Sequence, residues 1–230
     1  MQKKTNPIQI FLLDIFGSAS IGIYLRVTDR FMIVPNQAPA NALRKLEKWF
    51  KINVVRTNIG CSILAGSLVC ANSHGLILPH FVWEEEVTIL KNIPDINMTI
   101  MNTKKTAYGN LVLANDRGAI ADPRLGKEDV KAISDTLGVE VVSGEIAGLP
   151  YVGSLATATN KGVMAHPLIK SEEEKLLTDV LKVPVRVGTV NCGIPYIATG
   201  LIGNSYVAVA GSQTTGPELF MIDEALSGAD

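Results

Sequence analysis

The sequence has little that would direct the protein to nucleic acid, to a membrane or to an oxidising compartment. It has 21 basic and 22 acidic side chains, a formal net charge of −1, so it lacks the basic excess that a general electrostatic grip on nucleic acid requires. Three cysteines are an odd number in a chain too long to depend on disulfides, which favours a reducing compartment. No apolar run is long enough to cross a bilayer. Any contact with RNA is therefore expected to be local.

The N-terminus and the histidines also exclude particular classes. The apolar run after Lys3 and Lys4 is short, is followed by Asp14 and lacks a small-residue cleavage site, so it is unlike a signal peptide. We therefore expect a cytoplasmic protein. The three histidines do not have the spacing of a metal site, and no segment has the pattern of a phosphate-binding loop. We expect no metal and no cofactor.

The sequence does contain a phrase that occurs three times. GSLVCANSHGLILP begins at Gly66, GNLVLANDRGAIADP at Gly109 and GSLATATNKGVMAHP at Gly153. The leading glycines lie 43 and 44 positions apart, and a second glycine follows each after nine residues. Alternating apolar residues and a turn such as Asn115 to Gly118 are typical of a β-hairpin, with glycine supplying a positive φ. Each phrase therefore predicts two strands joined by a tight turn.

A helix and a third strand are expected after each hairpin. Val130, Ile133 and Leu137 have the spacing of one buried helical face. Short β-rich runs then follow, at 52–57, 96–101, 139–142 and 183–187. The unit is therefore strand, strand, helix, strand. Its acidic helix starts, at 84–86 and 172–174, are expected to be solvated first turns.

Two weaker copies complete a set of five. Residues 22–50 supply the first copy, and residues 200–226 supply the fifth, which lacks a third strand. The spare run 8–13 has the register of a third strand, because Ile10 precedes Gly22 by the same twelve residues that separate Val54 from Gly66. We expect this strand to complete the fifth unit and close a ring, which needs no capping repeats.

This pattern predicts an α/β chain with five-fold pseudosymmetry that forms one domain over residues 1–230. The expected units are approximately 15–60, 61–104, 105–148, 149–193 and 194–230, together with the N-terminal strand 8–13.

Several motifs point to one family. They are QTTGPEL within GSQTTGPELFMIDEAL, GTVNCGIPYIATG, RTNIGCSILAGSL, TAYGNLVLANDRGA and LATATNKGVMAHP. Over nearly the whole chain they resemble the translation initiation factor 6 family, its archaeal branch most closely, and the five units resemble its pentein, or α/β-propeller, fold. Cys192 departs from the pattern, because that family often has a basic residue there.

The resemblance implies a monomeric factor that prevents ribosomal subunits from associating, and no enzyme activity. It would bind the large ribosomal subunit at the intersubunit face, block joining of the small subunit, and act in large-subunit biogenesis and translation initiation. Its implied partners are ribosomal proteins, with local rRNA contact left open, and release factors that include a GTPase. No membrane or DNA contact is implied.

Asn110 is the first candidate for the ribosome contact. The resemblance places it at a position central to that contact, whereas the alternative is a local strand cap. Ser67 and Ser154 hold the same slot in sister units, so the fold does not require asparagine there. The other polar candidates lie in turns, where turn formation is the alternative for each. The candidate ribosome-binding residues are Ser67, Asn72, His74, Asn110, Asn115, Asp116, Ser154, Asn160 and Asn204.

Two other functions stay open at this stage. Pentein enzymes attack guanidino groups with a cysteine nucleophile, and Cys192 with His166 and Glu145 is the best such set here. A protein-binding ring in another pathway is the second. Cys61 and Cys70 are expected to be buried within apolar strands. Convergence of a cysteine, a histidine and two carboxylates in the central channel would favour the enzyme, and a channel of small and apolar groups would not.

Overall fold

The computed structural model describes residues 8–228 and contains five three-stranded sheets. In each sheet an antiparallel hairpin is extended by a parallel third strand. The sheets are β2 (Arg26–Val27), β3 (Phe31–Val34) and β4 (Asn53–Arg56); β5 (Cys70–Ala71), β6 (Gly75–Pro79) and β7 (Asn97–Met101); β8 (Val112–Ala114), β9 (Gly118–Ala121) and β10 (Glu140–Ser143); β11 (Ala156–Ala158), β12 (Val163–Ala165) and β13 (Val185–Val187); and β14 (Leu201–Gly203), β15 (Val207–Gly211) and β1 (Gln9–Leu13).

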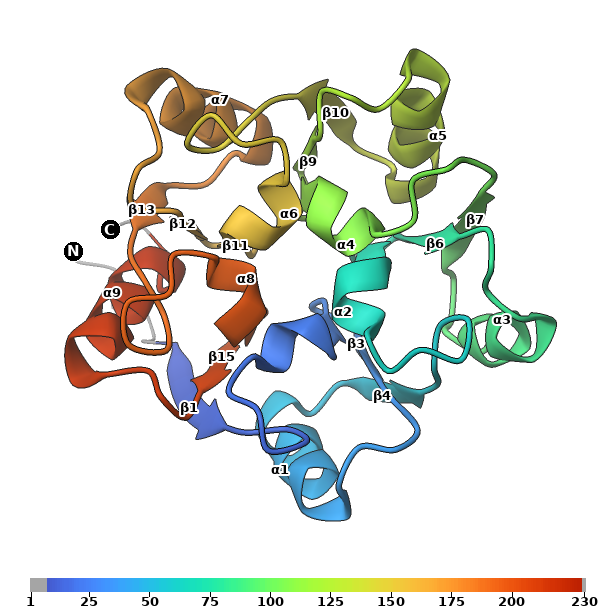
Figure 1. Cartoon of the computed structure of the whole chain (residues 1–230), viewed down its shortest axis with the longest axis horizontal. Helices are drawn as coiled ribbons and strands as arrows, with labels where there is room; N and C mark the ends of the chain where they lie inside the picture. Colours follow the sequence, from blue (N-terminus) through green and yellow to red (C-terminus); the bar gives the residue numbers. More distant parts are fainter. Residues whose placement is uncertain (1–7, 229–230) are drawn as a thin grey trace, which may run out of the picture.

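The five units lie around a common centre, with one helix of each at the perimeter and one short helix nearest the centre (Figure 1). The perimeter helices are α1 (Ala40–Phe50), α3 (Glu84–Leu90), α5 (Lys127–Leu137), α7 (Ser171–Leu181) and α9 (Gly216–Leu226). The inner helices are η1 (Ile21–Ile23), α2 (Ala65–Leu68), α4 (Tyr108–Leu111), α6 (Val152–Leu155) and α8 (Ile197–Gly200). Each inner helix contacts the next, and α8 contacts η1. The predicted α/β class and the five repeated units are confirmed.

The N-terminal strand belongs to the last sheet. β1 pairs in parallel with β15, in a register that places Gln9 opposite Val207 and Leu13 opposite Gly211. The backbone N–H of Ile8 also donates to the hydroxyl of Ser227 at 3.3 Å, close to the other end of the described chain. The twelve-residue spacing therefore predicted the partner of this strand correctly.

The leading glycines lie in the inner helices, not in the strands that the sequence predicted. A Cβ atom at Gly66 would overlap the carbonyl oxygen of Gly22, and the same holds for Gly109 against Gly66 and for Gly153 against Gly109. The inner helices η1, α2, α4 and α6 thus approach one another too closely for a side chain at Gly66, Gly109 or Gly153. A Cβ atom at Gly22 would overlap the carbonyl oxygen of Ala198. The fifth copy therefore makes this close contact through Ala198, whereas the sequence had suggested that the copy begins at Gly200.

The second glycines complete hairpins, as predicted, but for a different reason. Gly75, Gly118 and Gly162 do not have a positive φ. A Cβ atom at Gly118 would instead overlap the carbonyl oxygen of Val180 in α7, and the other two glycines meet the perimeter helix of the next unit in the same way. Close packing between units, not turn conformation, therefore selects glycine here.

The core consists of five apolar clusters, most of which join two neighbouring units. In one of them, Leu113 and Ile120 of the third sheet pack with Leu177 and Leu181 of α7. The helical faces predicted from the sequence are buried, as for Ile133 in α5. None of the helices between residues 8 and 228 is long and apolar enough to span a bilayer.

Candidate functional site

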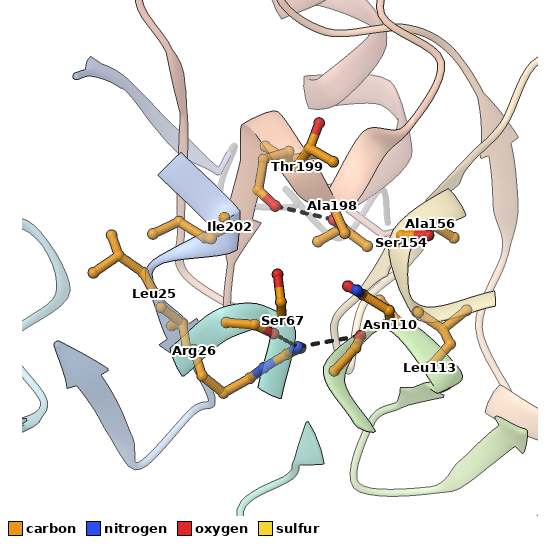
Figure 2. Close-up of a pocket in the computed structure, with 18 of the residues that line it drawn as sticks. Leu25, Arg26, Ser67, Asn110, Leu113, Ser154, Ala156, Ala198, Thr199 and Ile202 are labelled. Atoms are coloured by element: carbon orange, nitrogen blue, oxygen red, sulfur yellow. Dashed lines mark hydrogen bonds between the residues drawn. The ribbon is translucent and has the colours of Figure 1, made fainter. Parts of the chain in front are cut away.

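A cavity of about 60 Å³ lies at the centre of the five units, at the end formed by the inner helices (Figure 2). Ser67, Asn110 and Ser154 line it from α2, α4 and α6, and Thr199 lines it from α8. We call this end the helix mouth and define it by these four residues. The slots that directly follow three of the leading glycines, Ser67, Asn110 and Ser154, therefore lie at one end of the channel.

The four side chains of the helix mouth differ in their hydrogen bonds. Ser154 Oγ donates to the carbonyl of Tyr151 at 2.8 Å, and Thr199 Oγ1 donates to that of Tyr196 at 2.7 Å. The side chains of Ser67 and Asn110 make no hydrogen bond to any residue in the described range, and both are half-buried. Asn110 therefore does not act as a local cap there, and its amide can offer both a donor and an acceptor.

The hairpin turns form the opposite end of the same channel. A smaller cavity, of about 20 Å³, is lined there by Asp29, Asn72, Asp116, Asn160 and Asn204, which we call the turn mouth. Small residues such as Ala71 and Ala114 line both cavities, so the two mouths are opposite ends of one channel. The nine sequence candidates are therefore divided: Ser67, Asn110 and Ser154 lie at the helix mouth, and Asn72, His74, Asn115, Asp116, Asn160 and Asn204 lie in the turns.

The asparagines of the turns join one unit to the next. Asn115 Nδ2 donates to the carbonyls of Thr159 at 3.0 Å and Leu181 at 2.9 Å, and Asn72 bonds to the carbonyls of Asn115 and Leu137. Asn72, Asn115 and Asn204 are buried. The alternative interpretation as turn formers describes all three, and the contacts of Asn72 and Asn115 also extend between units. The side chain of Asn204 bonds only to the N–H groups of Tyr206 and Val207 in its own turn, and its Nδ2 has no partner among residues 8–228.

Two carboxylates connect units around the turn mouth. Asn160 Nδ2 donates to Asp116 Oδ2 at 2.6 Å and to Asp29 Oδ2 at 2.9 Å. Asp116 also accepts from the backbone and hydroxyl of Ser73, and Asp29 accepts in the same way from Ser205. These polar atoms are already bonded within the protein. His74 is the one exposed residue of the six turn candidates.

Arg26 is a channel residue that the sequence analysis missed. Its Nη2 donates to the carbonyls of Gly66 and Gly109, so one side chain of the first unit reaches the inner helices of the next two. Its Nε is closed off from solvent and has no hydrogen-bond partner among residues 8–228. Arg26 stands four residues after Gly22, a slot that is Cys70, Leu113, Thr157 or Ile202 in the other units. Arg26 is the one charged residue at this position of the repeat, and that difference was the feature of the sequence that could have identified it.

Burial changes the pKa values of Arg26 and Cys70, the two ionisable residues that occupy this position of the repeat. Burial lowers the pKa of Arg26, although a guanidinium stays charged in proteins. Burial also raises the pKa of the Cys70 thiol to about 11, against the opposing influence of the Arg26 charge. The thiol is therefore neutral near pH 7 and does not neutralise Arg26.

Three perimeter helices carry a buried glutamate that the sequence assigned to a solvated turn or left unassigned. Glu86 accepts from the backbone N–H groups of Gly60 at 2.6 Å and Cys61 at 2.9 Å, in the loop that follows β4. Glu173 and Glu218 hold the corresponding loops after β10 and β13. The prediction that these first turns are solvated is wrong for Glu86 and Glu173. A carboxylate at the third position of the helix can reach back to the loop of the previous unit and become buried there. Cys61, expected to be buried, is exposed in this loop.

Hydrogen bonds stabilise the ionised form of Glu218. Burial acts to raise its pKa, but bonds from the N–H groups of Thr215 and Gly193 and from the Thr189 hydroxyl lower it to about 2. The carboxylate thus connects α9 to the loop that contains Cys192.

Comparison with known proteins assigns the chain to a family. The model of the eIF-6 family matches residues 10–225. The chain belongs to the eIF-6 family. It is 46% identical to translation initiation factor 6 of Aeropyrum pernix, over 94% of each chain. It is 44% identical to the factor of the same name from Nitrosopumilus maritimus, over 95% of this chain and 99% of the relative, and 44% identical to that of Pyrococcus furiosus, over 93% and 96%.

The residues considered for catalysis do not meet in the channel of this eIF-6 family member. Neither channel cavity is lined by Cys192, His166 or Glu145. Cys192 is exposed, whereas His166 is buried and its Nδ1 accepts from the backbone N–H of Leu168 at 3.1 Å. Burial lowers the pKa of His166 in spite of the charge of Glu173. Within the described chain no three histidine, cysteine or acidic side chains are placed to hold a metal ion.

Proposed function

We propose that this protein binds the large ribosomal subunit at its intersubunit face and blocks joining of the small subunit, in large-subunit biogenesis and in translation initiation. Membership of the eIF-6 family and the names of its relatives support a role in translation initiation. The observation that carries the subunit contact is Asn110, whose half-buried amide lies at the helix mouth without a bond to the described protein.

We assign the contact to the helix mouth, since its surroundings favour a protein partner. Leu64, Tyr151 and Tyr196 immediately precede α2, α6 and α8, and each is between 38% and 47% exposed. Exposed tyrosines around small polar groups are typical of protein–protein interfaces, whereas rRNA phosphates select clustered basic side chains. The partner is then a large-subunit protein, with rRNA contact at the edge. Of the turn candidates, His74 and the half-buried Asp116 and Asn160 remain as a second, opposite contact.

The remaining features of the proposal follow from the same family. We propose an α/β-propeller of the pentein type, a single monomeric domain over 1–230 with the five units given above. It acts sterically in the cytoplasm, and release factors that include a GTPase remove it. The five sheets, the contact of each inner helix with the next and the β1–β15 pairing support this architecture.

Sedimentation of Asn110→Ala with purified subunits tests the site. Loss of an interfacial amide that leaves its partners buried and unpaired costs about 1 to 3 kcal/mol, so binding should weaken about 5- to 150-fold. The melting temperature should stay near that of the parent, because Ser67 and Ser154 occupy the equivalent slots. His74→Ala, in a hairpin turn beside the turn mouth, is the matched control and should bind normally. Normal binding by Asn110→Ala with weak binding by His74→Ala would place the contact at the opposite end.

An activity assay and the same sedimentation separate the alternatives. If the protein were a guanidino-modifying enzyme, it should turn over arginine or a methylated arginine, and Cys192→Ser should abolish this activity. We expect no turnover, and binding of Cys192→Ser within about 1 kcal/mol of the parent, the scale of an uncritical surface site. A protein-binding ring of another pathway would sediment with neither subunit.

A further inference from the structure

We propose that the channel binds a small monovalent anion, such as chloride or formate, between the guanidinium of Arg26, the hydroxyl of Ser67 and the side-chain amide of Asn110. Figure 2 shows these side chains at one side of the channel, with Ser67 and Asn110 directed into the cavity. They come from β2, α2 and α4, which belong to three consecutive units. This site does not depend on the proposed ribosome contact.

The charge of Arg26 has no counter-charge in its cavity. None of the residues that line the helix-mouth cavity is acidic. The acidic residues Asp29 and Asp116 belong to the turn mouth and are bonded to serine and asparagine groups there. A charge removed from water costs several kcal/mol unless an opposite charge or sufficient hydrogen bonds offset that cost. An anion beside Arg26 supplies the missing charge.

The hydrogen-bonding groups of the site suit an anion better than a cation. Only Nη2 of Arg26 bonds to the described protein, through the carbonyls of Gly66 and Gly109. Its Nε and Nη1 have no hydrogen-bond partner among residues 8–228; Nε is closed off from solvent, so Nη1 is the nitrogen that can donate to an ion. The Ser67 hydroxyl and the Asn110 amide can each donate a further hydrogen bond. Donors on three side chains therefore surround the cavity next to one positive charge.

The residues of the other units that occupy the position of Arg26 in the repeat and line the cavity have no charge that could pair with Arg26 in place of an anion. Leu113 and Ile202 are apolar, and the Thr157 hydroxyl already donates to the carbonyl of Leu201 at 3.0 Å. The cavity of about 60 Å³ is several times the roughly 10 to 15 Å³ that one water molecule needs on the same measure. A chloride ion therefore fits together with a water molecule, and gluconate, which is several times larger, serves as the reference anion.

Chloride binding to the whole protein tests the proposal. At constant ionic strength, replacing gluconate with chloride should raise the melting temperature by about 3 to 6 °C when chloride reaches ten times its Kd. The response should saturate, formate should compete, and ³⁵Cl line broadening should show the same Kd. Arg26→Met should abolish the response, and Asn110→Leu should weaken binding about 3- to 10-fold. Arg117→Met, which removes an exposed arginine bonded to the carbonyl of Lys182, is the control and should respond like the parent.

Crystals of the parent protein soaked in bromide provide a test that does not require a variant to fold. An anomalous peak between Arg26, Ser67 and Asn110 would support the site. A saturable chloride response that persists in Arg26→Met would overturn it, because the ion would then bind elsewhere. Absence of both the response and the peak would overturn it as well and assign the cavity to water.

Discussion

Asn115 Nδ2 in the third unit donates a hydrogen bond to the backbone carbonyl of Thr159 in the fourth, at 3.0 Å. The two residues occupy the same place in successive copies, 44 positions apart. Asn72 bonds to Asn115 in the same way, 43 positions apart, at 3.2 Å. A local turn residue therefore also aligns its unit with the next one.

Asn115→Ala should destabilise the protein. The change leaves the buried carbonyls of Thr159 and Leu181 and the N–H of Gly118 without their partner, at a cost of about 1 to 3 kcal/mol. For a chain of this size that is a fall in melting temperature of about 2 to 12 °C. Thermal melting beside Ser67→Ala, which should melt like the parent, measures the effect. An unchanged melting temperature for Asn115→Ala would show that water replaces the amide.

Gly109→Ala should be far more damaging than an ordinary glycine substitution. The added Cβ would overlap the carbonyl of Gly66, so two inner helices would have to separate, at a cost typical of overpacking, about 1 to 3 kcal/mol or more. Gly216→Ala is the matched control, since its Cβ meets nothing within 4 Å at the first turn of α9. The control should melt at or slightly above the parent temperature. Equal melting of the two variants would contradict the close contact of α2 and α4.

Glu218→Gln should make stability less dependent on pH in acid. The folded pKa of Glu218, about 2, lies below the ordinary value of 4.5, so its ionised form stabilises the fold above pH 4.5. That contribution is lost as pH falls through 2. At pH 7 the variant should be less stable by about 1 to 3 kcal/mol, and the gap should narrow between pH 4.5 and 2. Urea unfolding across this range measures it, and a constant gap would mean that the carboxylate titrates normally.

Deletion of residues 1–13 should unfold the protein or lower its melting temperature severely. It removes Ile8 and Leu13, which are buried and contribute about 1.5 to 3 kcal/mol each, and leaves β15 with an open edge. Typical total stabilities are only about 5 to 15 kcal/mol. The control is a circular permutant that attaches these residues behind residue 230 through a flexible linker and restores the pairing. A deletion variant that melts like the permutant would contradict the closing role of β1.

The repeat spacing was sufficient to predict the order of the strands and the perimeter helices, and the partner of β1. The period of 43 or 44 residues and the twelve-residue register are long-range relations that remain visible even in weak copies. The inner helices were missed because four-residue helices are too short to show a helical period. The role of the glycines was misassigned, because a glycine selected by close packing between units looks the same in the sequence as a glycine selected by a turn.

The site was only partly predictable. Ser67, Asn110 and Ser154 share a slot in the repeat, so their common location follows from the copies alone. To predict that the turn residues lie at the opposite end, one would have needed to know in which direction each strand runs along the channel. Arg26 and the buried Glu86 were missed because each acts on a neighbouring unit, and the sequence of a single unit does not reveal what its neighbour presents to it.

The pairing of β1 with β15 has a consequence for synthesis of the chain. β1 emerges from the ribosome about 200 residues before its partner, Val207–Gly211. The nascent strand therefore lacks its partner until Val207–Gly211 has been synthesised, with apolar Phe11 and Leu13 available to other chains or to chaperones. The fifth sheet forms only after Val207–Gly211 has emerged, so a product terminated before that segment lacks this sheet and should be readily recognised by quality control.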